Sequence, residues 1–223
     1  MTHLEITIRF PLATAFHTTG NRRRLWADKA LALSTDGTPI LPATTIKGYL
    51  RERAEVLLRT WGQKVCLPPA PTTMCSEKEL CLACRVFGNP RHPSPLRFRD
   101  GQFVQNPDTM VRSGVSISRS RQAALPQRLF FLETTDPQPG EVVATIEGDF
   151  ANPELARQAT ALIVLAARSG FAIGAGRTRG LGWLERDKMR IEARIGDQTV
   201  ENTLIEQYAH LWRGGEHVVE NQT

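Results

Sequence analysis

Residues 4-LEITIRF-10 alternate strictly between apolar and polar side chains. Successive side chains of a strand point to opposite faces of a sheet, so this pattern predicts a strand that buries one face and leaves the other in solvent. The segment 141-EVVATIEGDF-150 alternates in the same way and predicts a second such strand. Both strands require other elements to cover their apolar face.

Two segments with apolar residues at helical spacing can provide that cover. The first is 44-TTIKGYLRERAEVLLRTW-61, for which Thr44 or Thr45 is the expected cap. The second is 153-PELARQATALIVLAARSG-170, which Asn152 is expected to cap and which begins with a proline. Each segment has an apolar stripe and a polar face, as is typical of helices packed on a sheet.

Shorter strands are expected at 96-LRFRD-100, near 183–187 and at 189-MRIEARI-195. With insertions at about 62–95 and about 103–134 set aside, the order is β-α-β-β-α-β. That order is the split unit of ferredoxin-like α+β folds, whose helices cover one face of the sheet, and RRM-type modules bind RNA on the other face. We expect one domain over residues 1–223, with a loosely packed extension after about residue 205.

The second insertion contains a polar stretch that carries several arginines, 112-RSGVSISRSRQAALPQR-128. It lacks the apolar periodicity of a core element. We expect it to form a protruding β-hairpin.

The first insertion carries the four cysteines of the chain within 19 residues: Cys66, Cys75, Cys81 and Cys84. Thiols clustered in this way in a reducing compartment indicate a metal rather than disulfides. Cys81 and Cys84 form a Cys-x2-Cys knuckle, and two further thiolates would close the tetrahedral shell of a structural zinc ion. The alternatives are four reduced thiols, or a shell in which His92 replaces a cysteine.

The start of the chain, 1-MTHLEITIRF-10, lacks the basic and apolar blocks of a signal peptide. No apolar run reaches the ~18 residues that a membrane span needs. We therefore expect a cytoplasmic protein that does not bind to membranes.

Arginine dominates the positive charge of the chain. The formal net charge is +5, and 23 of the 28 basic residues are arginine. Because arginine binds phosphate through two hydrogen bonds and stacks on bases, such a surface suits RNA or DNA, although a GC-rich genome would produce the same ratio. Arg22, Arg23 and Arg24, in the loop 17-HTTGNRRRLWAD-28, are candidates for phosphate contacts.

Asp28 lies at the end of this basic loop. A carboxylate here either pairs with a neighbouring arginine or meets a metal ion or a hydroxyl group. In the second case it would help to hold Mg²⁺ beside a scissile phosphate or orient an attacking 2′-OH. Residue chemistry alone favours the ion pair.

The segment 174-GAGRTRGLGW-183 is rich in glycine and arginine. A dinucleotide fingerprint follows a strand and opens a helix, whereas this segment follows a helix and precedes a strand; it also lacks the Gly-Lys-Ser/Thr of a P-loop. The remaining interpretations are a tight turn, or a turn whose glycines let an RNA backbone approach. The candidate RNA-binding residues are Gly174, Gly176, Arg177, Arg179 and Gly180.

Several stretches together resemble the RAMP superfamily of CRISPR-associated proteins. The segment 40-ILPATTIKGYLR-51 is similar to the family's "ipgtslkGalR" pattern, and 84-CRVFGN-89 to its short "lFG" segment. The stretch 114-GVSISRSRQAA-124 with 129-LFFLE-133 resembles its thumb, and 174-GAGRTRGLG-182 its C-terminal glycine-rich loop. The order of these stretches is that of the family.

The likeness is closest to the repeated backbone subunit of type III effector complexes. It implies binding of guide RNA (crRNA) and target RNA, and contacts with further copies and with other CRISPR effector subunits. It also implies that an aspartate after the first strand, here Asp28, cleaves target RNA with Mg²⁺ or Mn²⁺, and that zinc occupies the cysteine insertion. The additional RNA-binding residues that it implies are Thr44, Thr45, Lys47, Arg51, Arg119 and Arg121.

The chain departs from the family pattern at two positions, Ala43 in place of glycine and Ser118 in place of the thumb aspartate. Asp36 lies close enough to Asp28 to be an alternative catalytic residue. Two other functions remain open. One is an RNA-binding scaffold without catalysis, and the other is a guide-processing endoribonuclease of the same superfamily that uses His17 as a general base without metal.

Overall fold

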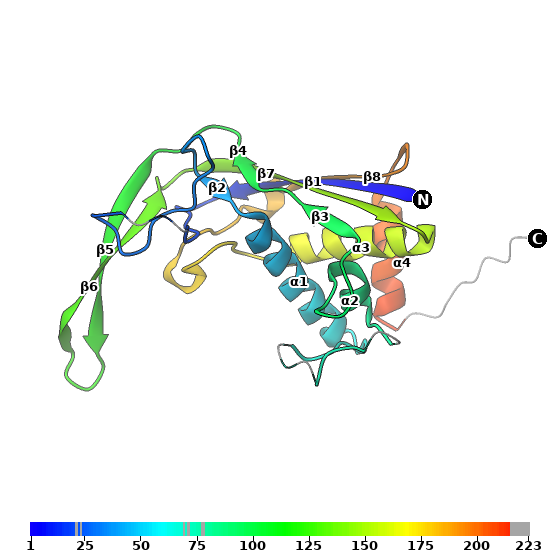
Figure 1. The fold of residues 1–223 in the computed structure, drawn as a ribbon, viewed down its shortest axis with the longest axis horizontal. Helices are drawn as coiled ribbons and strands as arrows, with labels where there is room; N and C mark the ends of the chain where they lie inside the picture. The colour runs from blue at the N-terminus through cyan, green and yellow to red at the C-terminus, as the bar shows by residue number, and fades with distance from the viewer. Residues whose placement is uncertain (21, 23, 69, 71, 77–78, 215–223) are drawn as a thin grey trace, which may run out of the picture.

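The computed structural model describes residues 1–20, 22, 24–68, 70, 72–76 and 79–214. Its main sheet is antiparallel and runs in the order β2-β4-β7-β1-β8-β9, with β3 also paired to β7 (Figure 1). The strands are β1 (Thr2–Leu12), β2 (Ile40–Leu41), β3 (Leu96–Phe98), β4 (Gly101–Phe103), β7 (Gly140–Phe150), β8 (Arg190–Ile195) and β9 (Gln198–Thr199). The three predicted strands at 4–10, 141–150 and 189–195 are therefore the centre of the sheet.

The register of β1 against β7 explains the alternation in the sequence. Ile6 lies opposite Ile146, and Ile8 lies opposite Ala144. These four side chains are fully buried on the same face of the sheet. The apolar positions of both strands thus form one continuous surface.

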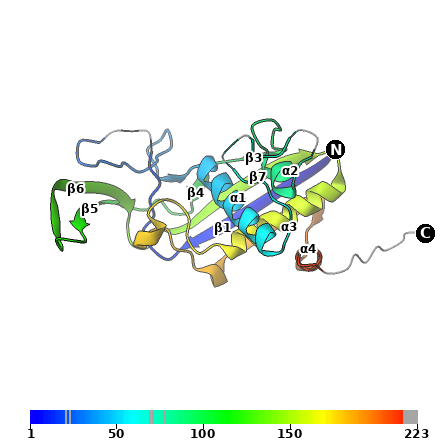
Figure 2. The same ribbon diagram turned by 90° about the horizontal axis from the view of Figure 1, so that it is seen from below.

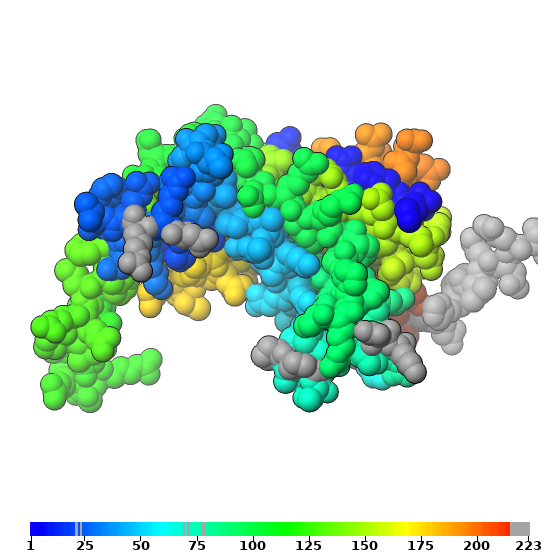
Figure 3. Space-filling model, viewed as in Figure 1, coloured from blue at the N-terminus to red at the C-terminus, as the bar shows by residue number. Residues whose placement is uncertain are grey.

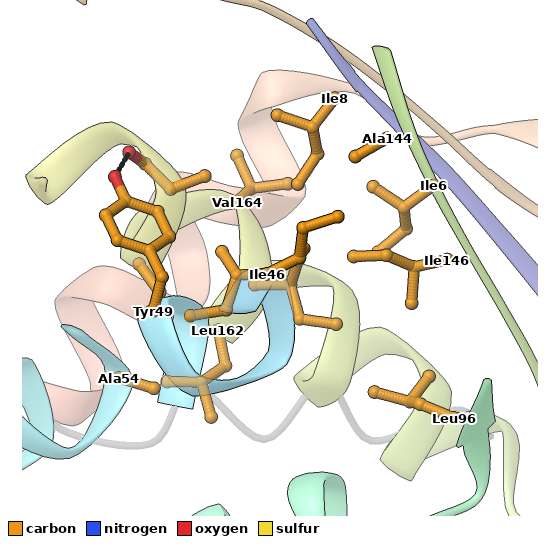
Figure 4. Close-up of a cluster of buried hydrophobic side chains, with 14 of the residues drawn as sticks. Ile6, Ile8, Ile46, Tyr49, Ala54, Leu96, Ala144, Ile146, Leu162 and Val164 are labelled. Carbon is orange, nitrogen blue, oxygen red and sulfur yellow. Dashed lines mark hydrogen bonds between the residues drawn. The ribbon is translucent and has the colours of Figure 1, made fainter. Parts of the chain in front are cut away.

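The helices α1 (Ala43–Thr60) and α3 (Pro153–Ser169) cover that surface, as Figure 2 shows from the helical side. Ile46 of α1 and Leu162 of α3 pack with Ile6 and Ile146 in the core (Figure 4). Both helices confirm the prediction from apolar spacing. The mixed α+β class is confirmed as well.

The two helices begin in different ways. Asn152 caps α3 as predicted, because its side-chain oxygen accepts a hydrogen bond of 2.9 Å from the Glu154 amide. The prediction for α1 was wrong, since Pro42 rather than Thr44 or Thr45 occupies the cap position. The carboxylate of Asp100 reaches across from the β3–β4 turn and accepts a bond of 2.7 Å from the Ala43 amide.

The prediction of a loose C-terminal extension was also wrong. Residues Asn202–Trp212 form α4, which packs against α3. The Trp212 ring stacks on Trp61 with centroids 6.4 Å apart, and the Tyr208 hydroxyl donates a bond of 2.7 Å to Glu154. Aromatic burial therefore holds this segment on the core.

The region 183–187 is not a regular strand. Trp183 bridges to Ala172, and Leu184 bridges to Leu12, so the chain passes between two partners within one residue. A short 3-10 turn, Arg186–Lys188, then leads into β8. This segment wraps the end of the sheet instead of extending it.

The predicted hairpin is present as β5 (Thr109–Ser118) and β6 (Ala123–Thr135), which pair only with each other in the main strand ladders and project from one end of the sheet (Figure 1). The cysteine insertion contains α2 (Leu82–Phe87), a short helix that its irregular sequence had not indicated. Within the described part of the chain, no helix is long and apolar enough to span a membrane.

Candidate RNA interface and cysteine site

The loop that carries Asp28 is joined to the base of the hairpin. The Asp28 amide donates to the Phe131 carbonyl over 2.9 Å, and the Phe131 amide donates to the Asp28 carboxylate over 2.7 Å. Lys29 continues the contact, because its carbonyl accepts from the Glu133 amide over 3.0 Å. The loop thus meets β6 through a single parallel bridge, Lys29 to Leu132, and the exposed Asp28 side chain accepts a hydrogen bond from a backbone amide of β6.

Glu133 fixes this loop from the buried side. Its carboxylate accepts a bond of 2.9 Å from the Leu31 amide, and the residue is only 5% exposed. A buried carboxylate is costly unless it is hydrogen-bonded, and this bond supplies a partner. We did not single out Glu133 from the sequence, although a lone acidic residue at the end of 129-LFFLE-133 is a usable signal.

His17 lies beneath the same junction and is 1% exposed. Its Nδ1 is 2.6 Å from the Glu133 carbonyl, and its Nε2 is 2.9 Å from the Thr19 hydroxyl. Burial lowers the pKa of His17, so the ring is held neutral. A general base must reach the proton that it removes, and a ring that is 1% exposed is poorly placed for this. The guide-processing hypothesis based on His17 therefore lacks support.

The glycine-rich loop meets the same region. The Ala175 amide donates to the His17 carbonyl over 2.8 Å. Arg179 lies over the Phe130 ring of β6, with its guanidinium carbon 5.5 Å from the centroid. Gly114 on β5 makes room for that ring, because a Cβ there would lie 2.3 Å from it. Three segments that are far apart in the sequence, 17–31, 129–133 and 174–180, therefore converge at the hairpin base.

Backbone geometry accounts for the glycines of this loop. Gly174, Gly176, Gly180 and Gly182 all have positive φ, between 66° and 93°. A Cβ at Gly182 would lie 1.9 Å from the Ile173 carbonyl oxygen, so close packing also requires glycine there. At Gly180, by contrast, a Cβ would meet no atom of the described residues within 4 Å. Gly180 is thus the glycine of this turn with open space beside it.

The candidate arginines differ in how they are engaged. Arg177 pairs with Glu52 over 3.0 Å, and Arg24 lies over the Trp26 ring at 5.3 Å. Arg51 is turned inward and donates hydrogen bonds of 2.8 Å to the Glu55 carboxylate and 2.9 Å to the Gly88 carbonyl. Among the candidate arginines within the described residues, the exposed ones are Arg22 in the loop, Arg119 and Arg121 at the hairpin tip, and Arg179. Arg23 lies outside the described residues.

The first turn of α1 presents the remaining candidates. Thr44 is exposed, whereas Thr45 and Lys47 are half-buried. The Lys47 ammonium lies 5.9 Å from the centre of the Phe98 ring. Burial, followed by the charge of Arg51, lowers the pKa of Lys47. This end of α1 is the one nearer to the hairpin (Figure 1).

Asp36, the alternative catalytic residue, belongs to a tight turn. Its carboxylate accepts hydrogen bonds from the Ser34 hydroxyl and from the amide and hydroxyl of Thr38. These bonds lower the pKa of Asp36 to about 2. The carboxylate thus stabilises its own turn, as is typical of aspartate at this position.

The open face of the sheet is rich in ion pairs. Arg9 pairs with Glu141 over 3.2 Å, Arg97 with Asp149 over 2.9 Å, and Arg99 with Glu147 over 2.9 Å. An RRM-type face instead presents aromatic rings to bases. Carboxylates on this face repel phosphate, so the hairpin side is the better RNA surface.

The four cysteines come together as the sequence predicted. All four sulfur atoms lie within 4.8 Å of one another. The Cys66 and Cys84 sulfurs are 3.4 Å apart, and those of Cys81 and Cys66 are 3.9 Å apart. A tetrahedral zinc ion with Zn–S bonds of about 2.3 Å places its ligands about 3.8 Å apart, so this donor set fits zinc.

Their surroundings also suit metal binding. Burial raises the pKa of the Cys84 thiol. Burial would raise that of Cys81 too, but hydrogen bonds from the Cys66 and Cys84 amides outweigh it and lower the pKa. Arg59 donates hydrogen bonds of 2.9 Å to the Cys66 carbonyl and 3.1 Å to the Glu55 carboxylate. Glu55, which also binds Arg51, thus connects α1 to the cysteine site.

Comparison with known proteins agrees with these features. The family model described as the RAMP superfamily matches residues 9–185, a span that includes the Asp28 loop, the cysteines, the hairpin and the glycine-rich loop. No curated protein matches the chain significantly. Proteins of this superfamily are CRISPR-associated and bind RNA, and the matched span exceeds half of the chain. The chain therefore belongs to the RAMP superfamily.

Proposed function

We propose that this chain is a guide-RNA-binding backbone subunit of a type III CRISPR effector complex. We also propose that it cleaves target RNA and that Asp28 is the catalytic residue. The convergence of the Asp28 loop, the hairpin base and the glycine-rich loop carries the proposal. RNA bound along the hairpin would pass all three segments at once.

The arrangement of the sheet supports a ferredoxin-like core for this role. The central strands follow the order β8-β1-β7-β3, with α1 and α3 on one face. In the proposed organisation, residues 1–223 are a single RRM-like domain. The cysteine segment and the hairpin are its two insertions.

The exposed arginines support contacts with an RNA backbone. Arg22, Arg119, Arg121 and Arg179 extend from the loop, the hairpin tip and the glycine-rich loop. Arginine at such positions neutralises phosphate and releases counterions, which makes affinity depend on salt. Arg51 is better suited to holding the cysteine site on α1, whereas Arg177, although paired with Glu52, remains half-exposed beside the glycine-rich loop.

Asp28 suits catalysis better than Asp36. Its side chain is exposed, and the Phe131 amide binds its Oδ2 atom; within the described residues, its Oδ1 atom accepts no hydrogen bond. A single carboxylate is sufficient for a divalent metal that draws its other ligands from RNA phosphates and water. Bound Mg²⁺ or Mn²⁺ would supply charge stabilisation at the scissile phosphate. The Phe131 amide would fix the direction of the carboxylate.

Zinc in the cysteine cluster would be structural. Four thiolates leave no open coordination position, and the cluster joins the end of α1 to α2. The ion would keep this insertion folded against the two helices.

Binding and cleavage by an assembled complex test the proposal. Affinity for guide RNA is expected to fall by a large factor between roughly 50 and 200 mM salt, and Arg119→Ala and Arg121→Ala are each expected to reduce the slope by about 1. Cleavage of labelled target RNA is expected only with Mg²⁺ or Mn²⁺. Salt-independent binding would contradict RNA-backbone contact, whereas binding without cleavage would identify a pure scaffold.

A further inference from the structure

Two exposed aromatic rings lie beside the glycine-rich loop. Phe171 is 49% exposed and Trp183 is 48% exposed. Their centroids are 6.3 Å apart, and the rings meet edge to face at 82°. Large apolar side chains left half in water are candidates for binding another molecule.

Hydrogen bonds fix the backbone at both residues and the indole of Trp183. The Trp183 amide donates a hydrogen bond of 3.0 Å to the Thr14 hydroxyl, and the Trp183 carbonyl accepts one of 2.7 Å from the Ala13 amide. The indole N–H of Trp183 donates a hydrogen bond of 3.1 Å to the Arg177 carbonyl. The Phe171 carbonyl accepts a hydrogen bond of 2.9 Å from the Leu184 amide. The Trp183 ring is therefore preorganised, and the protein would lose little conformational entropy there on binding a ligand.

Charged side chains complete a closed ring of contacts with this pair. Arg53 lies over Phe171 with its guanidinium carbon 5.9 Å from the centroid, and it pairs with Glu52 over 3.1 Å. Glu52 pairs in turn with Arg177 over 3.0 Å, and the Arg177 carbonyl holds Trp183. The ring of contacts thus joins α1, Phe171 just beyond the end of α3, and the glycine-rich loop. Figure 3 shows the gold surface of that loop beside the pale blue surface of α1.

The charge around the rings favours an anionic ligand. Burial raises the pKa of the neighbouring Tyr49 to about 12, against the opposing positive charges of Arg53, Arg186 and Arg177. Arg53 and Arg177 directly adjoin the two rings, and Glu52 offsets one of their two charges. Flat apolar rings among arginines match a nucleotide, whose base stacks and whose phosphate is anionic.

We propose that Trp183 and Phe171 form a stacking platform for one unpaired nucleobase of bound RNA, with Arg53 and Arg177 beside the adjoining phosphates. This inference rests on the proposed RNA-binding function and adds a base-contacting site to it. A base within a duplex is covered on both faces, so the platform selects a single-stranded nucleotide. The RNA would continue from it along Arg179 to the hairpin.

The test compares Trp183→Leu with Trp183→Phe in the full chain. The probe is a fluorescein-labelled single-stranded RNA of about 12 nucleotides, a length within the range that single-strand-binding folds occupy, measured by anisotropy at several salt concentrations. Trp183→Leu removes the aromatic face and is expected to raise Kd by about 5- to 150-fold, the range for loss of one base stack. Trp183→Phe keeps a ring and is expected to stay near the wild-type Kd. The salt dependence is expected to be unchanged in both, because no phosphate contact is removed.

The outcomes separate this site from the proposed function. Wild-type protein that shows no salt-dependent binding overturns the RNA-binding function itself. Wild-type binding together with an unchanged Kd in a folded Trp183→Leu variant overturns the platform alone. If that variant instead loses self-association in sedimentation while its Kd is unchanged, the rings contact protein, and the proposal is wrong.

A second measurement applies even if Trp183→Leu unfolds. Unlabelled RNA is expected to quench the tryptophan fluorescence of the wild-type chain more than that of Trp183→Phe, because a stacked base quenches an indole. Equal quenching in the two proteins would overturn the platform.

Discussion

The Asp28 carboxylate accepts a 2.7 Å hydrogen bond from the backbone amide of Phe131, a residue 103 positions further along the chain. The bond fixes the direction of an exposed carboxylate through the rigid backbone of β6. It also joins the candidate catalytic loop to the base of the hairpin, two segments that are far apart in the sequence.

The first prediction concerns catalysis. Asp28→Asn preserves an acceptor for the Phe131 amide but removes the negative charge, so target cleavage by the assembled complex is expected to fall by about 100-fold or more. Guide-RNA affinity is expected to stay at the wild-type level, as read by filter binding. Asp36→Asn is the matched control and is expected to cleave normally. Full cleavage by Asp28→Asn would remove Asp28 from the mechanism.

The second prediction concerns Glu133. Glu133→Ala leaves the buried Leu31 amide without its acceptor and is expected to lower the free energy of unfolding by about 1–3 kcal/mol. Glu133→Gln retains an acceptor oxygen and is expected to lose less. Urea denaturation measures both. Equal losses in the two variants would show that the hydrogen bond to Leu31 is not what Glu133 contributes.

The third prediction concerns the cysteines. Cys84→Ser is expected to lose bound zinc, measured by elemental analysis, and several kcal/mol of stability, because metal binding contributes directly to folding. Prolonged treatment of the wild-type chain with a chelator is expected to lower its Tm, as the Cys84→Ser substitution does. Ser76→Ala, in the same insertion, serves as the control and is expected to retain the metal. A wild-type chain purified without zinc and insensitive to added zinc would contradict the site.

The fourth prediction separates two glycines of one loop. Gly182→Ala forces a Cβ toward the Ile173 carbonyl at a φ of 66° and is expected to cost about 3 kcal/mol or more. Gly180→Ala has open space and is expected to cost only the left-handed conformation, about 1–2 kcal/mol. Thermal unfolding ranks the two variants. If Gly180→Ala also weakens RNA binding while the protein stays folded, Gly180 lies against the RNA backbone.

The fifth prediction concerns pH. Burial lowers the pKa of His17 below its ordinary value of about 6.5, so the unfolded chain binds more protons than the folded one in the interval between the two values. Stability is therefore expected to fall as pH drops below about 6.5, by at most about 1.4 kcal/mol per pH unit for this single proton. Glu133 and Lys29 are the charged neighbours that act on the ring, in opposite directions.

His17→Asn is the control for this pH effect, because its amide can still donate to the Glu133 carbonyl but does not titrate. Urea denaturation at pH 5.5 and pH 7.5 is expected to show a smaller difference for this variant than for the wild type. The opposite trend, with the wild type more stable at pH 5.5, would mean that His17 is charged in the folded protein.

Much of the scaffold follows from local patterns. The alternation in 4–10 and 141–150 and the apolar spacing in 44–61 and 153–170 identify the central strands and both covering helices. These patterns work because a side chain's face depends only on its position within its own strand or helix. The cysteines were recognisable for a similar reason, since metal ligands of one site often lie close together in the sequence.

Pairings between distant loops could not be inferred in this way. The sequence and the family resemblance offer Asp28, Arg177 and Arg51 as candidates, but the fold presents Asp28 to solvent, pairs Arg177 with Glu52 and turns Arg51 toward Glu55. Irregular segments have no regular repeat of apolar side chains, so their sequence does not indicate which residues they contact. The packing of α4 was not predicted for a related reason, because it depends on contacts with distant residues of α3 and with Trp61.

The sequence by itself thus determined the layered α+β scaffold, the cysteine donor set and the family. The tertiary structure decided which polar residues are free to act, because that depends on contacts across a hundred residues or more, such as the one between Asp28 and Phe131. It also brought Phe171, Trp183 and Arg53 together from three separate segments. Local periodicity specifies which face of an element is buried, whereas a site is formed by the packing of elements against one another.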